Sequence, residues 1–246
     1  MKYKLKRLST LNLFAGILHL FSAIGLVLYI VLVFKNTSDN TKFGGIDTST
    51  YNVTLTPCDG ARDNTCDINI GEDGVGYYIT TRRNFDSSPT YLLVMVVLFT
   101  ILTSISHFIM CYNKKYYNSA IASKNNPLRW VEYSITATLM LLLLSFSVGI
   151  KETSTLVLIA AISIVSMILG HVSEQSVTNN NKTSSIIITT CVFFMLLTIF
   201  GIIFWRYADI VNDFPNIPSF VTPLLILEFV LYMAFGIVHI LFISNL

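Results

Sequence analysis

Charged side chains and imidazoles are rare in the apolar segments of this chain. Apart from Arg129, at the start of one segment, they are carboxylates and histidines, which bind and release protons. Glu132 lies near the start of one segment, and no further charge occurs between it and Ile150. Glu228 lies in the middle of another segment, with His239 eleven residues later. A charged group at membrane depth is costly unless it faces a partner or a water-filled cavity. These side chains are therefore candidates for proton transfer, for pairing with a buried cation or for metal binding.

Three of the groups have matching depths if consecutive segments cross the bilayer in alternating directions. His19 lies about nine residues into the first segment, roughly 14 Å at a rise of about 1.5 Å per residue. His107 lies about five residues before the end of the second segment, and Glu132 about four residues into the third. This agreement predicts one shared polar cavity, in which Thr136, one turn after Glu132, could donate a hydrogen bond to it. The alternatives are histidines that bond backbone carbonyls in the core, and a Glu132 paired with Arg129, three residues earlier.

Glu228 and His239 form a second candidate pair. Eleven residues are about three helical turns, so both side chains lie on nearly the same face of a helix. An unpaired ionised carboxylate in mid-membrane would cost about 3 kcal/mol or more. The pair is a candidate proton path, and the alternative is a protonated Glu228 hydrogen-bonded to a neighbouring helix.

The composition places these residues in an integral membrane protein. The 246 residues are 53% hydrophobic and 12% charged, against about 25% charged residues in soluble domains. A helix needs about 20 mostly apolar residues to cross a bilayer, and six stretches meet this requirement. They are Thr10–Phe34, Tyr91–Tyr112, Arg129–Ile150, Ser154–Val172, Ser184–Trp205 and Ile217–Ile243. We expect an all-α bundle of six transmembrane helices that forms a single domain, residues 1–246.

The basic residues predict the orientation of this bundle, because short cytoplasmic loops are enriched in Lys and Arg. The N-terminus and the connections after the second and fourth segments hold nine Lys and Arg. The short connections on the other side hold only Lys151 and Arg206. The first apolar run is also longer than the core of a signal peptide, which has about 7–15 residues. We therefore expect a retained first helix and a cytoplasmic N-terminus.

The long connection between the first two segments, residues 35–89, is expected outside the cell. Alternating apolar and polar residues in Thr50–Leu55 and Val75–Thr81 predict a small β-hairpin. Cys58 and Cys66 enclose a short loop on the oxidising side of the membrane, which favours a disulfide, and two free thiols are the alternative.

Several stretches resemble one known family. Pro-Leu-Arg-Trp-Val-Glu-Tyr-Ser, residues 127–134, resembles the signature of the heliorhodopsins. Residues 11–20, the pair Ser106-His107, residues 166–170 and residues 217–221 are also similar to stretches of the first, second, fourth and sixth helices of that family. The resemblance covers the whole chain, and the motif around Glu132 is its specific part.

The resemblance implies a rhodopsin-like bundle of seven helices that binds all-trans retinal as a protonated Schiff base on a lysine of helix 7. Glu132 matches the counterion, His19 and His107 match the histidines of a polar cavity, and family members tend to be homodimers. The sequence departs from this pattern because no lysine lies inside any of the six segments. Helix 7 and its lysine are expected to be missing, which puts covalent binding of retinal in doubt.

Three functions follow from these observations. The first is a heliorhodopsin-like retinal photoreceptor, in the form of a truncated product, which senses light and could use it to move protons. The second is a retinal-free interaction or regulatory protein on the rhodopsin scaffold, with an unknown signalling partner. The third is a membrane enzyme that uses Glu132, His19 and His107 as acid–base or metal groups. The chain has no glycine-rich phosphate loop, no Cys/His metal spacing and no nucleophile elbow, and nothing in it predicts binding of nucleic acid. We therefore expect a non-enzymatic protein without a metal.

Overall fold

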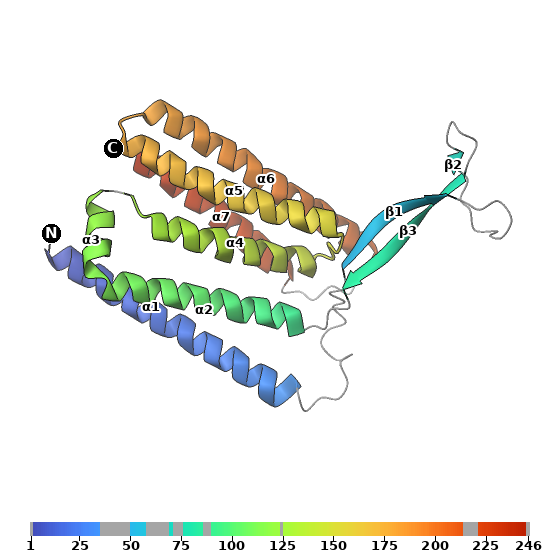
Figure 1. Ribbon diagram of the computed structural model, residues 1–246, viewed down its shortest axis with the longest axis horizontal. Coiled ribbons are helices and arrows are strands. Elements are labelled where there is room, and N and C mark those ends of the chain that lie inside the picture. Colours follow the sequence, from blue (N-terminus) through green and yellow to red (C-terminus); the bar gives the residue numbers. More distant parts are fainter. Residues whose placement is uncertain are drawn as a thin grey trace.

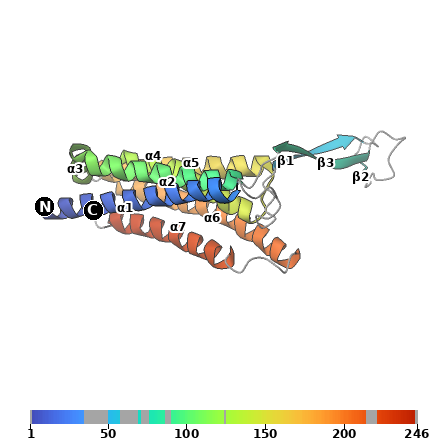
Figure 2. The ribbon, with the colours of Figure 1, turned by 90° about the horizontal axis from the view of Figure 1, so that it is seen from below.

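The computed structural model of the chain describes residues 2–34, 50–57, 69–70, 76–85, 90–123, 125–213 and 221–244. Long helices form a bundle, and a small β-sheet projects from one end of it (Figure 1). Both chain termini lie at the other end, as a second view also shows (Figure 2). We call these two ends the sheet end and the terminal end.

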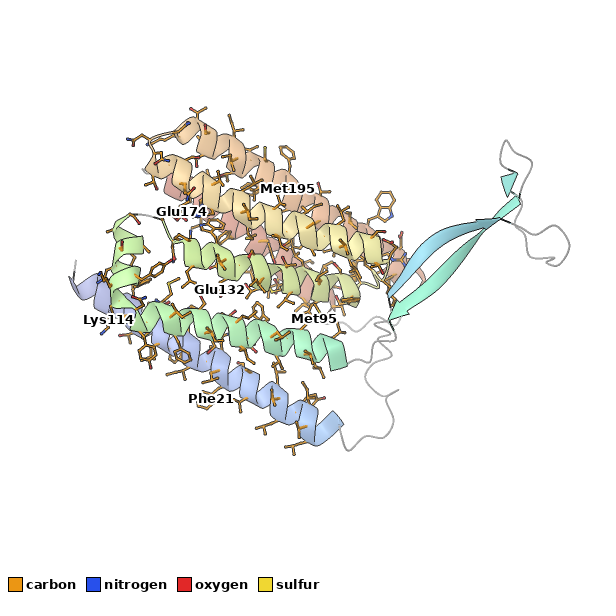
Figure 3. The ribbon with its side chains drawn as sticks, viewed as in Figure 1. Phe21, Met95, Lys114, Glu132, Glu174 and Met195 are labelled. Atoms are coloured by element: carbon orange, nitrogen blue, oxygen red, sulfur yellow. The ribbon has the colours of Figure 1, made fainter. Side chains whose placement is uncertain are left out.

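Six long helices build the bundle. They are α1 (Lys2–Tyr29), which continues as a π-helical turn η1 (Ile30–Phe34), α2 (Thr90–Tyr112), α4 (Pro127–Ser147), α5 (Thr153–Thr178), α6 (Lys182–Asp213) and α7 (Val221–Ser244). Each contains a stretch long and apolar enough to cross a membrane, which confirms the six predicted spans. Large apolar side chains such as Phe14 and Phe21 of α1 are mostly exposed on the outside of the bundle, where lipid would cover them (Figure 3).

The helices differ from the predicted bounds at several points; for example, α6 runs beyond Trp205 to Asp213. A short helix, α3 (Lys114–Ala122), lies at the terminal end between α2 and α4, where the sequence predicted only a loop. Asn113 caps it by accepting a hydrogen bond of 3.1 Å from the backbone N–H of Tyr116. The fourth span continues to Thr178 instead of ending at Val172, so α5 includes Glu174.

The first long connection contains three strands, β1 (Thr50–Pro57), β2 (Asn69–Ile70) and β3 (Gly76–Phe85). They form one antiparallel sheet in the order β1-β3-β2. The expected two-stranded hairpin is therefore a three-stranded sheet, because β2 pairs with the free edge of β3. Cys58 and Cys66, the predicted disulfide pair, lie outside the described residues.

Small and polar side chains allow the helices to approach closely. Ser104 of α2 donates a hydrogen bond of 2.8 Å to the carbonyl of Gly16 in α1. Thr138 of α4 donates one of 2.9 Å to Ser163 of α5, and both side chains are buried. Such contacts are typical of membrane helices, because lipid supplies no hydrophobic force between them. The apolar core lies nearer the sheet end and includes Leu141, Leu144, Val148, Ile159, Ile199, Phe200, Ile203 and Leu225.

Candidate functional site

Glu132 lies on the first turns of α4 and points towards α2 (Figure 3). Its Oε2 accepts a hydrogen bond of 2.8 Å from the Ser106 hydroxyl of α2. Thr136 is buried on the same helix, but its hydroxyl donates to the backbone carbonyl of Glu132, at 3.0 Å, and not to the carboxylate. Ser106 is thus an interhelical donor to the Glu132 side chain, and sequence reasoning did not single out this serine for that role.

The two histidines of the predicted cavity lie together on the other side of α2. The rings of His19 and His107 stack, with their centroids 5.9 Å apart and their planes 11° apart. His107 Nδ1 lies 3.1 Å from Asn12 Oδ1. Because Ser106 and His107 are neighbours in α2, the histidine pair and Glu132 are at one level of the bundle. No contact within the described residues joins Glu132 to either ring, however. The imidazole pair lies between α1 and α2, and the Glu132 carboxylate lies between α4 and α2, so α2 separates them.

An apolar chamber of about 340 Å³ lies between α2, α4, α5, α6 and α7. Its walls are mainly aromatic rings and long apolar side chains, namely Phe99, Tyr133, Ala137, Met140, Met167, Leu196, Leu231, Tyr232 and Phe235, with Thr136 and Glu228. This volume falls within the range of about 300–1,000 Å³ that is typical of small-molecule sites. Tyr133 directly follows Glu132 in α4, so the chamber lies beside the carboxylate.

Glu228 contributes an unpaired carboxyl group to the chamber. Its Oε2 is buried and has no hydrogen-bond partner among the described residues. His239 lies further along α7, near the terminal end, and lines a different cavity. Phe235 lines both spaces and lies between them along α7. The two members of the predicted proton path are therefore separated by an aromatic ring.

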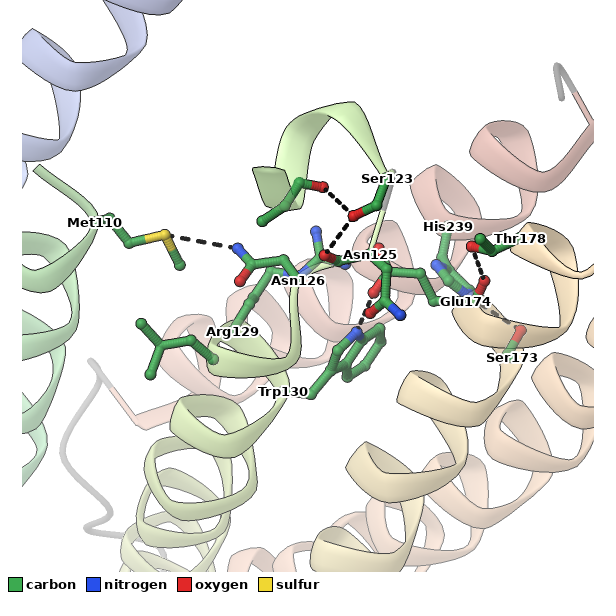
Figure 4. Close-up of polar contacts among 12 residues, drawn as sticks. Met110, Ser123, Asn125, Asn126, Arg129, Trp130, Ser173, Glu174, Thr178 and His239 are labelled. Carbon is green, nitrogen blue, oxygen red and sulfur yellow. Dashed lines mark hydrogen bonds and ion pairs between the residues drawn. The ribbon is translucent and has the colours of Figure 1, made fainter. Parts of the chain in front are cut away.

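The most extensive buried polar cluster lies at the terminal end and centres on Glu174 of α5 (Figure 4). Glu174 is only 4% exposed. Its Oε1 accepts a hydrogen bond of 3.0 Å from Arg129 Nη2, and its Oε2 accepts one of 2.5 Å from Trp130 Nε1. The Arg129 guanidinium also lies over the Trp130 ring, 5.1 Å from its centroid. Arg129 thus pairs with Glu174 and not with Glu132, the partner considered from the sequence.

The same cluster holds His239 in place. Its Nε2 lies 3.2 Å from the hydroxyl of Ser173, which also bonds the hydroxyls of Ser185 and Thr189 on α6. The Trp130 ring meets the His239 ring edge to face at 5.7 Å. A methyl group at Gly170 of α5 would overlap the Trp130 ring, so this position needs glycine. Arg129, Glu174 and His239 line a cavity of about 360 Å³ that α3 helps to cover.

Sequence reasoning missed Glu174 because it ended the fourth span before the polar run Ser173-Glu174-Gln175. One signal could have revealed it. Met167, Gly170, Glu174 and Val177 follow the three- and four-residue spacing of one helix face, and all four are buried. A carboxylate on an otherwise apolar helix stripe requires a buried partner.

These features define an integral, multi-pass membrane protein with two half-buried carboxyl groups, Glu132 and Glu228, beside an apolar chamber. The family model described as Heliorhodopsin matches residues 71–246, well over half of the sequence. The chain therefore belongs to the heliorhodopsin family. Comparison with curated proteins found no match.

Proposed function

We propose that this chain is a light-sensing heliorhodopsin whose chromophore pocket is the chamber between α2, α4, α5, α6 and α7. The observation that carries the proposal is the chamber itself. Tyr133, Ala137 and Met140 line it along α4, and most of its other lining residues are apolar or aromatic. These surfaces fit a polyene, which offers no hydrogen-bonding groups along its length. Bound retinal would supply the absorption of visible light and a change of shape.

The residues around the chamber have distinct parts in this proposal. Glu132 provides a negative charge beside the chamber, and the Ser106 hydroxyl orients its carboxylate towards α2. Glu228 provides a second carboxyl in the wall, without another hydrogen-bond partner, which could take up a proton. His239 is linked to the hydroxyls around Ser173 and lies beyond Phe235, towards the terminal end. A proton path from Glu228 to His239 would require movement of Phe235.

The experiment measures retinal binding by the purified chain through quenching of tryptophan fluorescence. Trp130 is close to the chamber, because its ring lies 6.0 Å from that of Phe235, whereas Trp205 is 75% exposed at the sheet end. In a Trp205→Phe background we expect all-trans retinal to quench Trp130 saturably. Ala137→Leu fills the chamber and is expected to weaken binding by about five- to 150-fold, since a steric overlap of this kind costs about 1–3 kcal/mol.

The matched control is Ala161→Leu, the same change on the exposed face of α5. It is expected to leave binding unchanged. Equal affinities in the Ala137→Leu and Ala161→Leu variants would contradict the chamber as the retinal site. A visible absorbance band that Glu132→Gln shifts would further assign the negative charge to Glu132.

A second function is favoured by one observation. No lysine lies within the six spans apart from Lys182, the first residue of α6. A covalent link to retinal therefore has no lysine inside these spans. The alternative is a retinal-free membrane protein that acts by interaction, as a homodimer or with a signalling partner. Absence of any saturable retinal quenching would favour it.

The orientation is part of the proposal as well. The nine basic residues in the N-terminus and in the connections after the second and fourth spans support a cytoplasmic N-terminus. The test is to introduce a cysteine at exposed Lys115 and to compare its labelling by a thiol reagent that does not cross membranes in intact and in permeabilised cells. Labelling of this cysteine in intact cells would contradict a cytoplasmic N-terminus.

A further inference from the structure

A second pocket lies at the sheet end, away from the chamber and from the Glu174 cluster. It has a volume of about 490 Å³ and is formed where the connection between α4 and α5 meets the last turns of α6. It is lined by Gly149, Ile150, Lys151, Glu152, Thr155, Gly201, Ile202, Trp205 and Arg206. We call it the interfacial pocket, because Arg206 is near the end of the α6 span.

Two cations converge on this pocket. Lys151 and Arg206 are the only Lys or Arg that the sequence places in or beside the short connections of this end. They come from different elements, yet both line the same space. Arg206 Nη1 is 3.9 Å from Asp209, and both side chains are about half exposed, so this ion pair is weak. Five guanidinium N–H groups allow Arg206 to bind another anion as well.

The carboxylate in the pocket wall already has partners. Glu152 accepts hydrogen bonds from the backbone N–H groups of Ser154, at 3.0 Å, and Thr155, at 2.5 Å. It thereby caps α5, where the helix dipole offsets its negative charge. Hydrogen bonds from Ser154 and Thr155 lower the pKa of Glu152 to about 2, as expected for a carboxylate bound to a helix N-terminus. The negative charge in the pocket wall is thus engaged by the N-terminus of α5, beside the two cations Lys151 and Arg206.

The other wall of the pocket is apolar and faces the bilayer. A methyl group added at Gly201 would meet no atom within 4 Å, so α6 has open space beside it one turn before Trp205. Trp205 is 75% exposed. Exposed indole rings at this depth are typical of the boundary between lipid tails and head groups. A polar, cationic rim thus continues into an apolar surface along α6.

We propose that the interfacial pocket binds an anionic phospholipid. Its phosphate lies between Lys151 and Arg206, and one acyl chain follows α6 past Trp205 and Gly201. A free phosphate would use only the cationic rim, whereas a phospholipid uses the rim and the apolar wall together. The inference concerns a site separate from the proposed chromophore chamber.

The test is native mass spectrometry of the full chain, purified in neutral detergent and supplied with phosphatidylglycerol or phosphatidylcholine. We expect the parent to bind phosphatidylglycerol in preference to phosphatidylcholine. In the double variant Lys151→Gln/Arg206→Gln, this preference should fall by about fivefold for each of the two charges removed. The pair Lys151→Arg/Arg206→Lys keeps the charge and should keep the preference. Lys114→Gln/Lys115→Gln removes the same charge from exposed positions at the terminal end and should also keep it. An equal loss in this last variant would overturn the site.

Two further arms separate a lipid from a free anion. A Cβ atom at position 201 meets no atom within 4 Å, so the Gly201→Leu side chain extends into the open space beside α6 and the variant should remain folded. It is expected to lower phosphatidylglycerol binding while leaving both cations in place. Inorganic phosphate at the same concentration should not compete. If Gly201→Leu bound phosphatidylglycerol as well as the parent does, or if inorganic phosphate competed with it, the proposal that the pocket binds a phospholipid would be wrong.

Discussion

Replacement of Glu174 by Gln is expected to lower the free energy of unfolding by about 2 kcal/mol. The side chain keeps its size but loses the charge that holds Arg129 and Trp130. Removing one partner of a fully buried ion pair costs about 3–5 kcal/mol, whereas hydrogen bonds between membrane helices average about 0.6 kcal/mol. The Arg129 side chain is 33% exposed. Water therefore solvates part of its charge in the variant, and the expected cost falls between these limits.

The assay is unfolding in mixed micelles with increasing sodium dodecyl sulfate, followed by circular dichroism. Glu228→Gln is the matched control, because it makes the same chemical change in a carboxyl group whose Oε2 has no hydrogen-bond partner among the described residues. We expect that variant to be as stable as the parent or more stable. A double-mutant cycle with Arg129→Gln should give a coupling of about 1 kcal/mol or more. A loss in Glu174→Gln no larger than in Glu228→Gln would refute the role of Glu174 as an anchor.

Two further predictions concern glycine positions and a helix cap. Gly170→Ala places a methyl group against the Trp130 ring and should cost about 1–3 kcal/mol. At Gly25 the methyl group of Gly25→Ala meets no atom within 4 Å, so this variant should stabilise α1 by up to about 1 kcal/mol. Thermal unfolding of the two alanine variants compares their stabilities. Equal changes in stability would contradict the close packing of Gly170 against Trp130. Glu152→Ala removes the cap of α5, which is worth about 1 kcal/mol. Because hydrogen bonds lower the pKa of Glu152 to about 2, this contribution is complete above the ordinary pKa of a glutamate and is lost as the pH falls towards 2. The difference in Tm between parent and Glu152→Ala should be constant above about pH 5 and shrink below about pH 4. If the difference in Tm did not change with pH, ionised Glu152 would not be the group that stabilises the start of α5.

The membrane spans were predictable because length and apolarity alone decide whether a helix can cross a bilayer. Their ends were less predictable. The sequence places Ser173, Glu174 and Gln175 together, and such a polar run usually marks the end of a span. In the structure α5 continues through it, since Arg129 and Trp130 of α4 satisfy the carboxylate. The start of α3 could have been predicted from Asn113, a favoured N-cap residue.

The candidate site was predictable in its residues and less so in its pairings. Depth along the helices correctly places His19, His107 and Glu132 at one level, because a helix has a fixed rise per residue. Depth says nothing about rotation around the helix axis. The structure shows that Ser106 and His107 of α2 face different neighbours, so the carboxylate and the imidazoles have separate partners.

The sequence by itself determined that this is a membrane bundle of six spans, that Glu132 and Glu228 lie within it, and that the motif around Glu132 is heliorhodopsin-like. The first two conclusions depend on composition and spacing, and the third depends on the resemblance of residues 127–134 to a family signature; all three use only local stretches of the sequence. Only the tertiary structure decided which charges meet. Arg129 and Glu132 are three residues apart and can share a helix face, yet Arg129 pairs with Glu174, forty-five residues later. The reason is that α4 packs between α2 and α5, so side chains one turn apart on α4 find different partners on its two neighbours.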